Sequence, residues 1–161
     1  MATTDVDLYR AVQKNTYDGW FESDGMPKDG FLYPSFNRTK FFNRKEQRWI
    51  DRRPDVAVKD GNVDKDGGGL SMHDTAGVLG FASWKYFGAP KGTEYQDLFI
   101  NGPGEKKAIR AGGIEGCHYQ IEPARMMTVE TYKGALDNFA RAAIVRQVKL
   151  AKGEIKEEKK E

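Results

Sequence analysis

The sequence predicts a single domain of mixed α/β (α+β) class, in which several short strands precede one long C-terminal helix. The composition, with 18 glycines and nine phenylalanines in 161 residues, is typical of a turn-rich domain with an aromatic core rather than of a helical bundle. Short apolar runs bounded by glycine, proline, asparagine and aspartate indicate the strands. With 39% hydrophobic residues, the chain is long enough to bury one core.

The long helix is predicted over 128–152. Tyr132, Leu136, Phe139 and Ala143 repeat at helical spacing and define a face that packs on the rest of the domain. Glu130 near the start of this segment and the basic residues near its end complement the helix dipole.

We expect the domain to occupy residues 1–153 and a charged tail to occupy residues 154–161. Gly153 follows the helix as a stop signal. The tail is lysine and glutamate with Ile155, so it has almost nothing apolar to bury. It is predicted either to continue the helix as a frayed end or to be disordered.

An early strand is predicted over 7–12, with Arg10 on the face opposite Tyr9. An arginine in an otherwise apolar strand is costly to bury without an anionic partner. Two readings stay open for Arg10: a structural carboxylate pairs with it, or it binds an anionic ligand.

A glycine run at 67–69 leads into a second predicted strand over 70–73. This strand places Ser71 and His73 on one face. Consecutive glycines let another molecule approach the backbone closely, so Gly69 beside Ser71 is a candidate binding position. The plainer interpretation is a glycine-rich turn before a strand.

A third strand is predicted over 117–122. A period of two places His118, Gln120 and Glu122 on the same face of it. Together with the two earlier strands, this strand can bring polar side chains into one cleft.

The most basic stretch of the chain lies over 37–53. Phe42 and Trp49 fall on one face of a helix that Pro54 would end, so we predict an amphipathic helix with a solvated basic face. The alternative is that basic and aromatic residues together follow a nucleic-acid backbone. The remaining predictions are short strands over 31–33, 55–58 and 78–82, a weak strand or single helical turn over 95–100, and a surface loop over 85–92.

Several classes of function are not expected. One cysteine and two distant histidines give no zinc-ligand spacing, so no metal site is predicted. The Walker loop, the dinucleotide glycine motif and the nucleophile elbow are missing from the sequence. No apolar run could span a membrane and no signal-peptide pattern is seen. A net charge of +2 does not argue for nucleic acid, and the single cysteine favours a reducing, cytoplasmic setting.

The polar strand residues suit one kind of chemistry in combination. The guanidinium of Arg10 can bind a diphosphate through two parallel hydrogen bonds. The hydroxyl of Ser71 can orient a ribose. A carboxylate such as Glu122 can stabilise an oxocarbenium-like centre, which the cleavage of a glycosidic bond requires.

The chain resembles the type VI secretion effector toxins that have the fold of ADP-ribosyltransferases. The similar segments keep their order from residue 8 to residue 147. They are Leu8-Tyr9-Arg10-Ala11-Val12, Tyr17-Asp18-Gly19, Asp55-Val56-Ala57, Asp60-Gly61, Gly68-Gly69 with Ser71, Asp74, Ala76-Gly77-Val78-Leu79, His118-Tyr119 with Ile121, Pro123-Ala124, Met127, Leu136-Asp137-Asn138-Phe139, Arg141, Ala143-Ile144 and Arg146-Gln147.

The resemblance implies a split, strongly bent β-core with flanking helices and a cleft for NAD. In the arginine–serine–glutamate group of these enzymes, an arginine of the first strand holds the phosphates, a serine supports the nicotinamide ribose and a late-strand glutamate drives transfer. Arg10 and Ser71 match the first two positions. Glu122 is the candidate for the third and Glu115 is the reserve.

His118, on the same face as Glu122, completes the expected catalytic set. Tyr9 and Gly69 complete the expected dinucleotide site. At the position before the serine, this chain has Leu70 where the family has a polar residue.

The function that the resemblance implies is an intracellular cytotoxin, an NAD-dependent ADP-ribosyltransferase that modifies an unidentified cellular target in the cytoplasm. An immunity protein is an expected partner, whereas a membrane and nucleic acid are not. Two alternatives stay open: a cytotoxic binding protein with the same fold but no transferase activity, and a nucleic-acid-directed toxin that uses the basic patch at 38–53.

Overall fold

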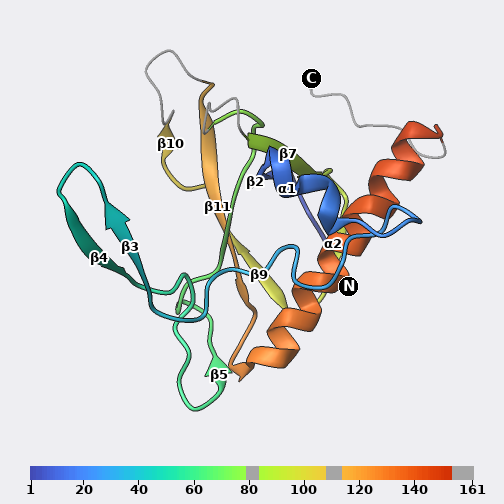
Figure 1. The fold of residues 1–161 in the computed structure, drawn as a ribbon. Helices are drawn as coiled ribbons and strands as arrows, with labels where there is room; N and C mark the ends of the chain where they lie inside the picture. The colour runs from blue at the N-terminus through green and yellow to red at the C-terminus, as the bar shows by residue number, and fades with distance from the viewer. Residues whose placement is uncertain (79–83, 108–113, 154–161) are drawn as a thin grey trace.

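A bent antiparallel sheet and one long helix form the body of the protein (Figure 1). The computed structural model describes residues 1–78, 84–107 and 114–153. The elements in order are β1 (Ala2–Thr3), β2 (Leu8–Gln13), α1 (Lys14–Tyr17), the 3-10 turn η1 (Asp18–Trp20), β3 (Thr39–Asn43), β4 (Arg48–Arg52), β5 (Asn62–Val63), β6 (Leu70–His73), β7 (Trp84–Ala89), β8 (Glu94–Tyr95), β9 (Leu98–Asn101), β10 (Lys106–Lys107), β11 (Gly116–Pro123), β12 (Met127–Thr128) and α2 (Val129–Ala151).

The main sheet has the strand order β10-β11-β6-β2-β7, and β9 also pairs with β11. Its pairings are antiparallel. β2 pairs with β7 along its whole length, whereas in the described part of the chain its register with β6 is the single pair Tyr9↔His73. The sheet is therefore joined across its middle by one residue pair, and β2 and β6 separate beyond it.

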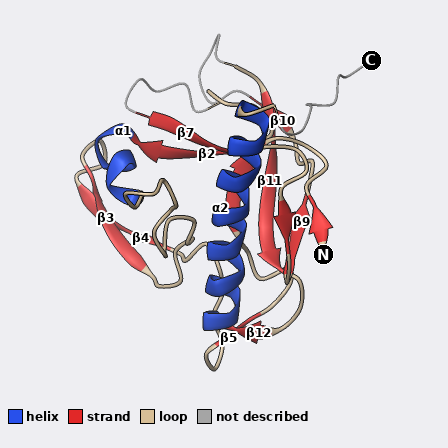
Figure 2. Cartoon of the chain, turned by 90° about the vertical axis from the view of Figure 1, so that its right-hand side faces the viewer, coloured by secondary structure: helices blue, strands red, loops and turns tan. Residues whose placement is uncertain are grey.

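The two halves of the sheet run in different directions. In Figure 2, β2 and β7 run across the direction of β9 and β11, and α2 passes over both halves. This arrangement agrees with the split, bent β-core that the resemblance implied.

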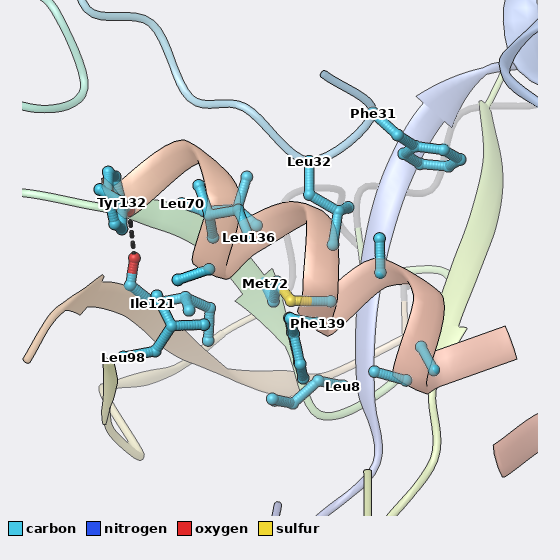
Figure 3. Close-up of a cluster of buried hydrophobic side chains, with 14 of the residues drawn as sticks. Leu8, Phe31, Leu32, Leu70, Met72, Leu98, Ile121, Tyr132, Leu136 and Phe139 are labelled. Carbon is cyan, nitrogen blue, oxygen red and sulfur yellow. Dashed lines mark hydrogen bonds between the residues drawn. The ribbon is translucent and has the colours of Figure 1, made fainter. Parts of the chain in front are cut away.

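Helix α2 supplies the apolar face that closes the core, as its periodicity predicted. Thr128 caps the helix, because its Oγ1 accepts a hydrogen bond from the Thr131 backbone N at 3.1 Å. The buried helix residues include Tyr132, Leu136 and Phe139, which pack against side chains from the sheet (Figure 3). The sheet side chains of this core include Leu8, Leu70, Met72, Phe87 and Ile121.

One polar contact fastens the helix to the sheet within this core. The hydroxyl of Tyr132 donates to the carbonyl oxygen of Ile121 at 2.6 Å (Figure 3). Burial raises the pKa of the Tyr132 phenol, so the hydroxyl stays protonated and keeps donating.

The predictions for β2, β6 and β11 are confirmed to within one or two residues at each end. In β6, Leu70 and Met72 are buried while Ser71 is exposed, as the alternation of side chains requires. The predicted charged tail at 154–161 lies outside the described residues, and so does most of the predicted strand at 78–82.

The predicted helix over 37–53 is wrong, because this stretch forms the β3–β4 hairpin. The side chain of Asn43 accepts a hydrogen bond from the Glu46 backbone N at 3.0 Å, and Gln47 adopts a positive φ of 53°. Both features make a tight turn. Phe42 and Trp49, seven residues apart, are cross-strand neighbours rather than neighbours on a helix.

Three other local predictions are wrong, and a fourth is partly confirmed. The predicted loop over 85–92 is mostly β7, in which Phe87 and Ala89 point into the core; Gly88 and Pro90 had suggested a loop. The predicted strand at 31–33 is a buried turn, and the one at 55–58 is reduced to an isolated bridge. The weak element at 95–100 is divided between β8 and β9.

Replacing Leu136 by aspartate should unfold the domain. Leu136 is 0% exposed, and an unpaired buried carboxylate costs several kcal/mol against a total stability of roughly 5–15 kcal/mol. Val148→Asp on the exposed side of the same helix is the matched control and should leave the melting temperature nearly unchanged. Equal melting temperatures for Leu136→Asp and the unmodified protein would contradict this packing.

Candidate active site

A row of ring side chains crosses the middle of the sheet. The register pairs Tyr9 with His73 and His73 with His118, so the three side chains lie side by side on one face. Ser71 and Gln120 form the next pair along β6 and β11. Since Leu70 and Met72, the alternate residues of β6, point into the core, Ser71 and His73 lie on the opposite face of this strand.

Ser71 and His118 are in direct contact within this row. The Ser71 Oγ and the His118 Nε2 are 3.0 Å apart, and the tautomer of the imidazole decides which atom donates. The ring of His73 lies edge-on to that of His118, with the centroids 5.4 Å apart. The hydroxyl of Ser71 is thus held in place beside two imidazoles, and Ser71 itself is exposed.

Arg10 reaches this region from the other side of β2. Its register partner is the buried Phe87, and its side chain leaves the strand on the face opposite Tyr9, as predicted. The guanidinium Nη1 donates to the carbonyl oxygen of Ser71 at 3.0 Å. Arg10 therefore connects β2 to β6 where the two strands separate, through the main chain of Ser71 rather than through its hydroxyl.

The electrostatic surroundings of Arg10 are mixed. Burial lowers the pKa of its guanidinium, the charge of Asp55 raises it and the charge of Arg52 lowers it. An arginine remains cationic in proteins under these influences.

The remaining N–H donors of Arg10 have no acceptor among the described residues. Within those residues no buried side-chain nitrogen or oxygen lacks a partner, so these donors reach the solvent. Arg10 is therefore a half-buried cation with donors available to an anion.

Glu122 lies on the same face of β11 as His118, but its carboxylate is already bound. Its Oε1 accepts from the Asp66 backbone N at 2.7 Å, and its Oε2 accepts from the Asn101 Nδ2 at 2.8 Å. The residue is 1% exposed. In this conformation Glu122 holds β9 and the segment before β6 against β11.

Glu115, the reserve candidate, lies just before β11 and on the side of β10. Its carboxylate pairs with the Lys106 Nζ of β10 at 3.7 Å, and both side chains are exposed. The structure brings Arg10, Ser71 and His118 together and leaves Glu115 outside this group.

The glycine run before β6 has a packing reason that the sequence did not reveal. A Cβ atom at Gly68 would lie 2.0 Å from the Asp55 carbonyl oxygen, and Gly68 has a φ of 104°. A Cβ atom at Gly69 would lie 2.4 Å from the Ile121 carbonyl oxygen. Both glycines therefore allow the backbone to pass close to neighbouring main chain.

Two hollows lie near this region. One, of about 500 Å³, is lined by residues of 57–67 and by Met126. The other, of about 330 Å³, is lined by Tyr9, Tyr86 and Gln147 among others. Of these two, the second reaches the row of ring side chains, through Tyr9.

His73 and Gln120 belong to this row, and the sequence placed them on the same strand faces as Ser71 and His118 without giving them a role. Their alternation with Ser71 and His118 was visible, but only the strand register shows that they form one surface. Within the described ranges, no three His, Cys, Asp or Glu side chains are grouped to hold a metal ion.

Comparison with known proteins identifies the family. Residues 3–148 match the family described as the Tse2 ADP-ribosyltransferase toxin. The chain is also 36% identical over 156 residues to the toxin Tse2 of Pseudomonas aeruginosa, a match that covers 93% of this chain and 95% of that protein. The chain belongs to the Tse2 family of ADP-ribosyltransferase toxins.

Membership confirms the mixed α+β fold of the ADP-ribosyltransferase kind and a cytotoxic, ADP-ribosyltransferase-like function. NAD is the substrate of such transferases in general. Among the described helices, none is long and apolar enough to cross a membrane.

Gly69→Ala should destabilise the protein strongly, because the added methyl group would overlap the Ile121 carbonyl and force β6 and β11 apart. Thermal denaturation measures this. Gly19→Ala is the matched control, since a Cβ atom there meets nothing within 4 Å. If Gly69→Ala melted at the temperature of Gly19→Ala but failed to bind NAD, the glycine would serve the ligand rather than the packing.

Proposed function

We propose that this protein is an NAD-dependent ADP-ribosyltransferase whose dinucleotide site lies where β2 and β6 separate. The observation that supports it most directly is the hydrogen bond from the Arg10 Nη1 to the Ser71 carbonyl oxygen at 3.0 Å. This contact joins a half-buried cation to the strand that presents an exposed hydroxyl. Family membership supplies the reaction class.

Arg10 would bind the diphosphate of NAD. Its remaining guanidinium donors reach solvent, and a planar fork of N–H groups matches two phosphate oxygens. Because burial weakens solvent screening, an anion beside this cation gains more than it would on an open surface. The hydrogen bond to Ser71 fixes the direction in which the fork points.

Ser71 and His118 would bind the ribose that carries nicotinamide. The serine hydroxyl is held by the imidazole at 3.0 Å and can exchange that partner for a ribose hydroxyl. Tyr9 and His73, in the same row, offer ring faces to the nicotinamide. In ADP-ribosyl transfer, the bond between nicotinamide and ribose breaks and the acceptor forms the new bond to the same ribose carbon.

Glu122 would supply negative charge to the sugar as it becomes cationic. A carboxylate in a low-dielectric setting acts on a nearby cation more strongly than one in water. Direct contact with a ribose would require the segment around Asp66 to release one carboxylate oxygen. These contacts also support a second role for Glu122, in which it positions the segments of Asp66 and Asn101 without touching the ribose.

We also propose a cellular compartment for the activity of this toxin. NAD and a reducing environment are both found in the cytoplasm, and we propose that the toxin acts there on an unidentified cellular target. An immunity protein that neutralises it is the partner we expect from the family.

Arg10→Ala should lower NAD cleavage, measured as nicotinamide release, by about a hundredfold. Two charge-assisted hydrogen bonds of about 1.5 kcal/mol each correspond to that factor. Arg10→Lys should recover little, because an ammonium group cannot form the parallel pair. Arg141→Ala removes a partly exposed arginine of α2, which pairs with Asp29, and is the control for a general charge effect.

The Arg10→Ala result counts only if its melting temperature stays close to that of the unmodified protein. Full activity in this variant and in Ser71→Ala would contradict the proposed site. An unfolded Arg10→Ala with an active, folded Arg10→Lys would instead assign a structural role to the cation.

Glu122→Gln separates a transferase from a binding protein. The amide can keep both contacts if its oxygen faces Asp66 and the Asn101 amide turns to accept, so the fold should survive. A transferase that uses the charge should then lose nicotinamide release by at least about tenfold while NAD affinity is kept. Unchanged turnover would exclude Glu122 as the catalytic charge and would leave it the positioning role.

A further inference from the structure

The β3–β4 hairpin is separate from the main sheet. It forms a two-stranded sheet of its own among the described strands, and Figure 1 shows it extending away from β11 and α2. Its five register pairs run from Thr39↔Arg52 to Asn43↔Arg48. Each strand is about 17 Å long, so the hairpin is an exposed ribbon with two open faces.

Large aromatic side chains are exposed on this ribbon. Trp49 is 67% exposed, Phe41 46% and Phe42 43%. Phe42 and Trp49 are paired across the strands, with ring centroids 5.6 Å apart in an edge-to-face arrangement. Three exposed aromatic rings within five-residue strands form a concentrated patch, and such patches mark interaction sites.

The charge of the hairpin is almost entirely of one sign. Residues 38–53 include two acidic side chains and seven basic ones. All seven basic side chains are exposed: Arg38, Lys40, Arg44, Lys45, Arg48, Arg52 and Arg53. The Glu46 carboxylate is paired with the Arg48 Nε at 3.0 Å, and Asp51 lies opposite Lys40. Because the whole chain has a net charge of only +2, the rest of the molecule is net negative and the hairpin is its positive pole.

We infer that the β3–β4 hairpin binds single-stranded nucleic acid. Cations along the ribbon can neutralise successive phosphates, and exposed rings between them can stack on bases without reading sequence. A solvated basic helix, which the sequence favoured, would have packed its aromatic residues inward; in the hairpin they face solvent. The inference does not depend on the proposed NAD site.

A protein partner is the less favoured reading of the same surface. A stable protein interface buries about 800 Å² on each side around a well-packed centre. The hairpin is a narrow ribbon, and neither of the two hollows described above includes its residues. A strand of a few nucleotides fits a ribbon of this size.

The test is fluorescence anisotropy of a labelled uridine oligonucleotide of about 15 nucleotides with the full chain and no NAD present. We expect binding at about 50 mM salt that weakens steeply as salt rises. Trp49→Ala should weaken binding about tenfold, which corresponds to one base that no longer stacks, without changing the salt slope.

A charge variant separates phosphate binding from stacking. Lys40→Gln with Arg44→Gln should reduce the slope of log Kd against log salt by about 0.7 for each phosphate that is no longer neutralised. Lys149→Gln with Lys152→Gln removes the same charge from the exposed end of α2 and should leave the slope unchanged.

Three results would overturn the inference. One is the absence of binding at low salt, and another is equal weakening by the hairpin and α2 charge variants. The third is competition by polyglutamate as strong as that by unlabelled RNA, which would identify an acidic protein surface as the ligand. Melting temperatures of all variants must match that of the unmodified chain, which excludes unfolding as the cause.

Discussion

The packing of α2 across the bend of the sheet is the interaction on which the rest of the structure depends. Leu136 and Phe139 are fully buried against strands from both halves, and the Tyr132 hydroxyl donates to the Ile121 carbonyl within the same core. Since the helix occupies one face of the sheet, the polar side chains of β6 and β11 are left on the other. Hydrophobic burial thereby decides where a ligand can reach the strands.

The separation of β2 from β6 gives the site its chemistry. One register pair joins these strands, and the Arg10 guanidinium bridges the gap beyond it. Arg10 links β2 to β6, and thus the two halves of the sheet, while its other N–H donors reach solvent. The same residue can therefore serve stability and anion binding, which is why the proposed experiments read the melting temperature beside activity. Glu122 differs from Arg10, because both of its carboxylate oxygens already accept hydrogen bonds within the protein.

The sequence was informative where burial follows a simple period. The helical repeat of α2 and the alternation in β6 and β11 follow directly from one buried face, so they could be predicted. The structure of the stretch around Phe42 and Trp49 could not be predicted in this way. Two residues seven positions apart lie on one face of a helix, but they are also cross-strand neighbours in a hairpin with a four-residue turn. Contacts between distant segments were also invisible, including the close approach of Gly69 to Ile121 and the hydrogen bond of Arg10 to a main-chain oxygen.

The two histidines provide the most direct test of the proposed site. His73 and His118 are the only histidines in the chain, and both lie in the row beside Ser71. We would record the imidazole ring signals by NMR while adding an NAD analogue whose nicotinamide–ribose bond cannot be cleaved. The account predicts that the His118 signal moves with the analogue, and that Arg10→Ala abolishes the change in a folded protein. Histidine signals that stay fixed at saturating analogue, or that move equally in Arg10→Ala, would contradict it.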